Sequence, residues 1–238
     1  MPTLHAADLL ITGDGRPSVP QGAALVDGRT VAAVGPYGEL AAAHPTARVR
    51  RWPGLLAPGL LNPYGPELLE HAYHPDPREA DELGTEPLVG AALAALAMTD
   101  ARWGASARRG VQRMLAHGTV AVAGELRRPA VVDAVRRAGL SVQPRPAGVA
   151  VGAAGRAAAG VRSGAVPEGP AAPDGGPGLD PLAGGRGLTE ALVAPFPSPG
   201  AAATFAVFDV PDEAALSERG AVTCVATVLS GRLVHRRR

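Results

Sequence analysis

The chain has 238 residues, of which 46% are apolar, so it can form one large domain or two small ones around a buried core. Its 23 basic and 22 acidic residues leave a formal net charge of +1, which gives no field that would attract nucleic acid or an anionic membrane. The single cysteine, Cys224, excludes an intramolecular disulfide, and the longest uncharged apolar stretch, residues 87–98, is too short to span a bilayer. The N-terminus lacks a signal-peptide pattern. We expect a cytoplasmic protein that binds neither nucleic acid nor a membrane.

The N-terminal part, residues 1–54, carries short strand signals separated by turn residues. Two β-like runs flank Asp27-Gly28, and an Asp-Gly pair between such runs is typical of a hairpin turn. This part is therefore predicted to be mostly β. The expected elements are strands over residues 9–12, 24–26, 30–34 and 48–52, and a short helix over residues 38–43.

The second part, residues 55–146, alternates strand and helix signals, which is typical of β/α units with parallel strands. Its strongest helix signal has apolar residues on one face, Asp100 as the expected N-cap and Gly118 as the expected stop. The expected elements are a strand over 55–61, a helix over 101–117, a strand over 119–123, a helix that begins at Pro129 and stops at Gly139, and a strand over 140–143.

The last two parts differ in kind. Residues 147–200 are rich in Gly, Pro and Ala, so few side chains could offset the chain entropy, and we expect a flexible linker with a short helix near 189–193. Residues 201–238 return to strand signals. Here the expected elements are a strand over 204–209, a helix over 212–218, and strands over 222–229 and 232–235 that flank the turn Ser230-Gly231.

Several segments resemble the amidohydrolase superfamily. Residues 54–62 (an apolar run, a Pro-Gly step, a second apolar run and an Asn) resemble the start of its first barrel strand, and residues 115–122 resemble the junction between a helix and the second barrel strand. Residues 9–34, and residues 203–209 with 225–234, resemble the two halves of the composite β-sandwich in proteins of the imidazolonepropionase and aminodeoxyfutalosine deaminase type. The resemblance implies a mixed α+β fold, in which residues 1–54 and 201–238 form the sandwich, 55–146 form part of a (β/α) barrel and 147–200 link them.

The resemblance also implies a metal site whose ligands are missing here. In that family two histidines one residue apart follow the first barrel strand, but the matching positions are Tyr64 and Pro66, neither of which is a usual zinc ligand. Later strands of the family supply further histidines and an aspartate, yet no histidine lies between Gly118 and Val234. A complete barrel takes about 200 to 250 residues, more than lie between the two sandwich halves. We therefore expect a truncated barrel with no bound metal or other cofactor, and we assign no catalytic residue.

One acidic cluster leaves an alternative open. Residues 67–86 include His71, His74, Asp76 and Glu79, which could in principle bind zinc or another divalent ion. Pro75 and Pro77 interrupt any helix through this cluster, so the helical spacing that would bring both imidazoles together is not ensured.

These two interpretations of the metal site lead to two alternative functions. The first is an imidazolonepropionase-like pseudo-enzyme, nominally a hydrolase acting on non-peptide carbon–nitrogen bonds, that has lost catalysis and acts in binding or assembly. The second is an active metal-dependent hydrolase of such bonds with a rebuilt site around His71 and His74. Because a truncated barrel leaves sheet edges uncovered, we also expect a homodimer or a complex with a full-length amidohydrolase relative.

Overall fold

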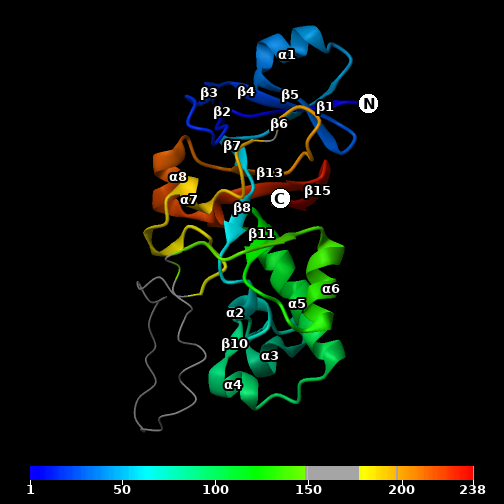
Figure 1. Ribbon diagram of the computed structural model, residues 1–238, viewed down its shortest axis with the longest axis vertical. Helices are drawn as coiled ribbons and strands as arrows, with labels where there is room; N and C mark the ends of the chain where they lie inside the picture. Colours follow the sequence, from blue (N-terminus) through cyan, green and yellow to red (C-terminus); the bar gives the residue numbers. More distant parts are fainter. Residues whose placement is uncertain (148, 150–176, 197, 238) are drawn as a thin grey trace. The chain divides into compact units, whose positions relative to one another are not determined.

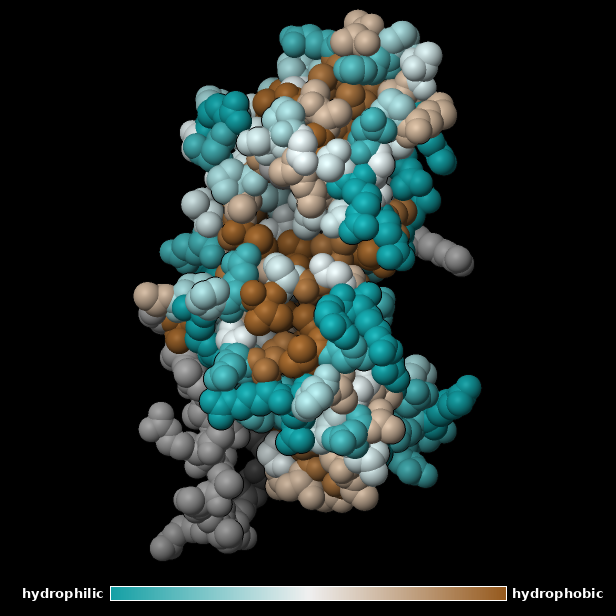
Figure 2. All heavy atoms as spheres, turned by 45° about the vertical axis from the view of Figure 1, so that its right-hand side comes forward, coloured by the Kyte–Doolittle hydropathy of each residue, from teal (hydrophilic) through white to brown (hydrophobic). Residues whose placement is uncertain are grey.

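A computed structural model describes residues 1–147, 149, 177–196 and 198–237 (Figure 1). The chain divides into two compact units: unit 1 comprises Met1–Asn62, Gln112–Ala121 and Asp180–Arg238, and unit 2 comprises Pro63–Val111 and Val122–Leu179. On the face seen in Figure 2, apolar side chains are visible among hydrophilic ones, as on an ordinary protein surface. Within the described residues no helix has the length and apolar character needed to cross a membrane.

The first sheet of unit 1 has the strand order β5-β4-β1-β6. β4 and β5 form the predicted hairpin, in which Asp27 lies opposite Thr30 and Gly28 adopts a φ of 57°, a conformation that glycine accepts readily. β1 is antiparallel to β4 and parallel to β6. Helix α1 packs on one face of this sheet. The bounds are β1 Thr3–Ala6, β4 Gly22–Asp27, β5 Thr30–Pro36, α1 Tyr37–Ala43 and β6 Arg48–Arg51.

The second sheet of unit 1 joins the two ends of the chain, with the strand order β15-β14-β13-β7-β2-β3. C-terminal β13 is antiparallel to N-terminal β7, and Phe205 lies opposite Pro58. The predicted turn at Ser230-Gly231 joins β14 to β15, and the side chain of Asp212 caps α8 by accepting a hydrogen bond from the backbone N–H of Ala215. The bounds are β2 Leu9–Leu10, β3 Val19–Pro20, β7 Leu55–Pro58, β13 Phe205–Phe208, α8 Glu213–Arg219, η4 Ala221–Thr223, β14 Cys224–Leu229 and β15 Arg232–Arg236.

The two sheets share one apolar core. Val26 and Val31 of the first sheet lie in the same buried cluster as Phe205, Val207 and Val228 of the second. Burial of such side chains supplies the main force that holds the sheets face to face. The predicted α+β fold, with a composite β-sandwich assembled from both chain ends, is confirmed.

The barrel-like part is short. Its sheet has the order β12-β11-β8, and within the described residues these three strands form no closed barrel, as predicted. The boundary between the two units passes through α5 and β11. The bounds are β8 Leu60–Asn62, α2 Gly65–Leu69, β9 Ala72–Tyr73, η1 Pro77–Glu79, α3 Ala80–Leu83, β10 Leu88–Val89, α4 Gly90–Ala94, α5 Asp100–Leu115, β11 Thr119–Ala123, α6 Pro129–Ala138 and β12 Ser141–Gln143.

Two local predictions are wrong in detail. The single strand expected over 55–61 is split at Gly59 into β7, which joins the sandwich, and β8, which joins the three-stranded sheet. Any side chain at Gly59 would collide with Val120, so the split depends on a close approach that only glycine allows. The expected cap of α5 is also displaced by one residue, because Thr99 Oγ1, rather than Asp100, accepts a hydrogen bond from the backbone N–H of Arg102 at 3.2 Å.

The Gly/Pro-rich segment contributes to the fold where it is described. Leu182, Leu188 and Ala191 are buried in the apolar cluster that also contains Phe208, and they belong to or flank η3 (Ala183–Gly185) and α7 (Leu188–Ala191). The predicted short helix near 189–193 therefore begins slightly earlier. Residues 148, 150–176 and 197 lie outside the described residues, so the flexible linker and the four-part division of the chain stay predictions.

The sandwich core buries a histidine. His5 is 3% exposed, Trp52 Nε1 donates a hydrogen bond to His5 Nδ1 at 3.2 Å, and the Phe205 ring contacts the imidazole edge-on. Burial, and secondarily the positive charge of Arg50, lowers the pKa of His5 to about 4. The imidazole is therefore neutral in the folded state at pH values where the unfolded chain already binds a proton.

This shift predicts acid sensitivity in a defined window. Because the folded pKa of His5 lies below 6.5, the free energy of unfolding should fall as pH drops from about 6.5 to about 4, by roughly 3 kcal/mol in total for this group. Urea unfolding across this range should show a smaller slope for His5→Gln, which keeps an acceptor for Trp52 but does not titrate. An unchanged slope would contradict a buried neutral His5.

Candidate functional site

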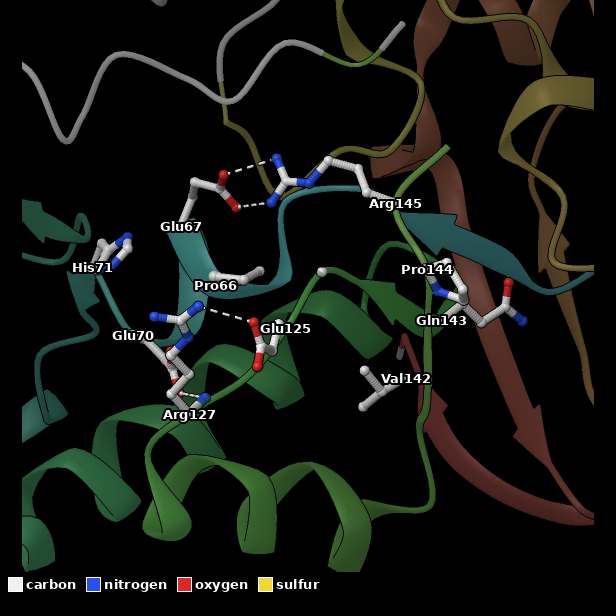
Figure 3. Close-up of a pocket in the computed structure, with 11 residues that line it drawn as sticks. Pro66, Glu67, Glu70, His71, Glu125, Arg127, Val142, Gln143, Pro144 and Arg145 are labelled. Atoms are coloured by element: carbon white, nitrogen blue, oxygen red, sulfur yellow. Dashed lines mark hydrogen bonds and ion pairs between the residues drawn. The ribbon is translucent and has the colours of Figure 1, made fainter. Parts of the chain in front are cut away.

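A pocket of about 760 Å³ lies at the carboxyl ends of β11 and β12, entirely within unit 2 (Figure 3). We call it the strand-end pocket. In open α/β sheets and in (β/α) barrels, ligands bind at this end of the strands. The position therefore makes it the candidate site. It is lined by Pro66, Glu67, Glu70, His71, Gly124, Glu125, Arg127, Val142, Gln143, Pro144 and Arg145.

Glu67 and Arg145 form a bidentate ion pair at the wall of the strand-end pocket (Figure 3). The two contacts are Arg145 Nη1 to Glu67 Oε1 at 2.8 Å and Nη2 to Oε2 at 2.9 Å. The Glu67 side chain is 5% exposed and the Arg145 side chain 18% exposed, so the pair is largely shielded from water. The Nη2 contact is a charge-assisted hydrogen bond, whereas the Nη1 contact is an ion-pair contact without hydrogen-bond geometry. Both oxygens of Glu67 are therefore engaged within the protein.

Glu70 binds the start of the next helix. Its Oε1 accepts hydrogen bonds from the backbone N–H groups of Arg127 at 2.7 Å and Arg128 at 2.6 Å, just before α6 begins. Arg128, at the N-cap position, makes no side-chain cap of its own. The Glu70 carboxylate, supplied from the end of α2, thus satisfies N–H groups at the helix start and places negative charge where the helix dipole favours it.

The positions expected to carry metal ligands lie at the start of α2. Tyr64 precedes α2, and Pro66 occupies its first turn. Pro66 lies so close to the chain after β11 that a Cβ on Gly124 would come within 2.7 Å of the Pro66 Cδ atom. A proline ring here fixes the first turn of α2 but offers no lone pair to a cation.

The residues of the pocket do not fit the divalent metal that the resemblance implies. A cation beside Glu67 would face the guanidinium of Arg145, which already neutralises that carboxylate. Glu70 Oε1 accepts two backbone hydrogen bonds, and Tyr64 and Pro66 replace the expected imidazoles. In the part of the chain that the structure describes, no group of three or more His, Cys, Asp or Glu side chains could hold a metal ion.

The structure does not bring the four residues of the alternative metal site together. The buried His74 has Nε2 2.8 Å from the carbonyl oxygen of Leu68, whereas His71 is exposed and lines the strand-end pocket. Asp76 and Glu79 form the capping box of η1. Asp76 also pairs with Arg109, and Glu79 pairs with Arg102.

Glu79 is further fixed by a tyrosine. The hydroxyl of Tyr73 donates a hydrogen bond to Glu79 Oε2 at 2.6 Å, and this contact is the largest cause of the lowered pKa of the Glu79 carboxyl. Arg102 Nε in turn donates to the Tyr73 hydroxyl oxygen at 3.1 Å. The polar cluster read from the sequence as a potential ligand set is thus a network that joins α5 to the chain between β9 and α3.

Sequence reasoning assigned no role to Arg127 or Arg145, and it included Glu67 and Glu70 only as members of the polar cluster over residues 67–86. A signal was present, since two glutamates three residues apart follow the first barrel-like strand and Arg145 follows the strand predicted over 140–143. Side chains that follow neighbouring strands of one sheet tend to meet at the same edge. That Glu67 pairs with Arg145 could be seen only in the structure.

Comparison with known proteins agrees with the architecture. Residues 25–47 match the family model of the bacterial imidazolonepropionase-like composite domain. Over these residues the resemblance to the imidazolonepropionase type that was expected from the sequence is confirmed. No curated protein sequence matches the chain.

Three solved structures are similar to part of the chain. A. niger ochratoxinase is 22% identical with a TM-score of 0.42, over 60% of this chain and 31% of that chain. Helicobacter pylori aminofutalosine deaminase is 12% identical with a TM-score of 0.39, over 60% and 33%, and a triazine hydrolase variant is 17% identical with a TM-score of 0.41, over 59% and 34%. The matched part thus spans about a third of each of these proteins.

The ion pair at the strand-end pocket yields a stability prediction. Arg145→Met should lower the free energy of unfolding by about 3 kcal/mol, because it leaves the buried Glu67 carboxylate without its partner. The double variant Glu67→Gln/Arg145→Met should recover much of that loss, since no charge then remains buried. A urea-denaturation double-mutant cycle measures the coupling, and additive losses would show that the two side chains do not interact.

The contact between Glu70 and the start of α6 yields a second stability prediction. Glu70→Ala should cost about 1 to 2 kcal/mol, the usual loss for a removed helix cap, because the N–H groups of Arg127 and Arg128 lose their acceptor. Glu70→Gln keeps an acceptor oxygen and should cost less. Equal losses in thermal denaturation would argue against the cap.

Proposed function

We propose that this chain is an imidazolonepropionase-like, amidohydrolase-superfamily protein that no longer catalyses hydrolysis and acts in binding or assembly. The observation that carries the proposal is that the carboxylates of Glu67 and Glu70 at the strand ends are bonded to other groups of the chain. Glu67 is held by Arg145, and Glu70 by backbone N–H groups, at the position where a working member would need groups free to act on a substrate.

The chemistry of the nominal reaction supports this view. Hydrolysis of a carbon–nitrogen bond needs an activated water, which a metal ion or a general base must supply. The pocket residues do not fit a metal, and both oxygens of Glu67 and the Oε1 atom of Glu70 are engaged within the protein. His71 is exposed at the pocket, whereas His74 is buried with Nε2 against a carbonyl oxygen, so no observation favours the rebuilt hydrolase site around these two residues.

A role in binding or assembly is supported by what the chain retains. The composite sandwich has a buried apolar core, and its helix α8 is capped by Asp212, so this part of the fold is intact. Among the described strands of the barrel-like part, β12 ends the three-stranded sheet, and a strand edge without a neighbour is a surface on which a partner can pair. A homodimer and a complex with a full-length amidohydrolase relative are the two assemblies we propose.

The test is a hydrolysis assay on the purified chain with cyclic amides and amino-purines, with added zinc or manganese and after treatment with a chelator. We expect no turnover above the uncatalysed rate under any condition. Chelator-sensitive turnover that is lost in His71→Ala/His74→Ala would refute the proposal and support the rebuilt site. Elemental analysis of the same sample gives the metal content independently of any choice of substrate.

A further inference from the structure

The edge strand β6 of the first sheet differs from the opposite edge of the same sheet. At the β5 edge the chain returns to cover the strand: the backbone N–H of Val31 donates to the carbonyl of Ala201 at 2.9 Å, and the N–H of Gly200 donates to the carbonyl of Val31 at 2.8 Å. Among the described residues, β6 pairs only with β1 and ends the sheet. Within that part of the chain, one edge of the sheet is thus closed by the chain itself, and the other edge has no further strand.

The backbone of β6 presents pairing groups on its open side. The N–H groups of Arg48 and Trp52 donate to the carbonyls of Pro2 and Ala6, so alternate residues of the strand face β1. In a parallel ladder the intervening residues, Val49 and Arg51, direct their N–H and C=O groups away from β1. These groups can hydrogen-bond to another extended chain.

The side chains beside this edge are cationic. Arg48, Arg50 and Arg51 all lie on β6, and the described residues supply none of them with an ion-pair partner. They lie on both faces of the strand: Arg50 is in register with the inward-facing His5, whereas the Arg51 guanidinium stacks 4.4 Å from the Tyr37 ring centre on the α1 face. Stacking uses the flat face of a guanidinium and leaves its N–H donors free for an oxyanion. Val49, 41% exposed, adds an apolar contact.

We propose that β6 is a docking edge for an extended acidic segment of a partner protein, which would add a strand to the sheet and place its carboxylates beside the three arginines. Opposite charges on neighbouring strands stabilise pairing, whereas like charges oppose it. A second copy of this chain does not fit, because pairing β6 with β6 would bring arginines together. Among the described strands, moreover, only β4 carries an acidic residue, Asp27. The inference names the partner chemistry for the binding role proposed above, and rests on it.

The direct test is fluorescence anisotropy with the full chain and a labelled eight-residue peptide of alternating Glu and Val. A matched peptide with Gln in place of Glu removes the charge, and an N-methylated Glu peptide keeps the charge but loses backbone donors. We expect only the unmodified Glu peptide to bind tightly, with affinity that falls as salt is added. Equal binding of the Glu and Gln peptides, or undiminished binding of the N-methylated peptide, would overturn the proposal.

Variants of the chain separate backbone pairing from charge. Val49→Pro removes one outward N–H without touching a bond to β1, and should weaken binding about fivefold, the loss of one hydrogen bond. Arg48→Glu should weaken it at least as much, because an attraction becomes a repulsion. Arg219→Glu on α8 makes the same change of net charge elsewhere in unit 1 and should leave the affinity unchanged. A loss of affinity in Arg219→Glu equal to that in Arg48→Glu would count against the site.

Amide hydrogen exchange gives a readout that needs no variant. The peptide should slow exchange at Val49 and Arg51 and leave Arg48 and Trp52, which already bond to β1, unchanged. An oligothymidylate that binds as tightly as the peptide, and that Val49→Pro does not weaken, would assign the surface to nucleic acid and overturn the proposal. If peptide binding fails while the hydrolysis assay stays negative, this inference alone is lost; measurable hydrolysis would instead refute the pseudo-enzyme.

Discussion

The antiparallel pairing of β13 with β7 is the constraint on which the rest of unit 1 depends. β7 lies next to β2 from the N-terminal end, and β13 carries β14 and β15 from the C-terminal end, so this one ladder places both chain ends in a single sheet. Phe205 and Val207 of β13 then join Val26 and Val31 of the other sheet in one core. The cost in chain entropy of bringing distant segments together grows only slowly with the length of the loop. Large changes between the two halves are therefore compatible with an intact sandwich.

At the strand-end pocket the governing interaction is electrostatic. A buried carboxylate must be paired or hydrogen-bonded, because its removal from water is costly. Arg145 supplies the counter-charge for Glu67, and the start of α6 supplies N–H donors for Glu70. Both partners come from the chain itself, so the pocket meets this requirement without a metal. The same two contacts connect α2 to α6 and to the end of β12, so they hold the barrel-like remnant together as well as occupying its carboxylates.

Much of the fold could be predicted from local signals. The Asp27-Gly28 and Ser230-Gly231 turns, the left-handed Gly139 after α6 and the Asp212 cap of α8 all act within a few residues, and sequence reasoning placed the elements around them. Gly59 was missed for a different reason. A run of apolar residues predicts one strand whether or not the strand is interrupted. The interruption at Gly59 involves a close approach to Val120, which is distant in sequence.

At the candidate site, too, some features follow from the local sequence and others depend on residues that are distant in sequence. From its residue types alone the sequence determined that Tyr64 and Pro66, rather than histidines, follow the segment that resembles the first barrel strand, and that His71, His74, Asp76 and Glu79 are polar groups close together along the chain. Only the tertiary structure decided what the polar groups do: Glu79 bonds to Tyr73 and Arg102, and Glu67 bonds to Arg145. The physical reason is that an ion pair depends on distance in space and on shielding from water. Neither quantity is encoded by the spacing of residues along a chain.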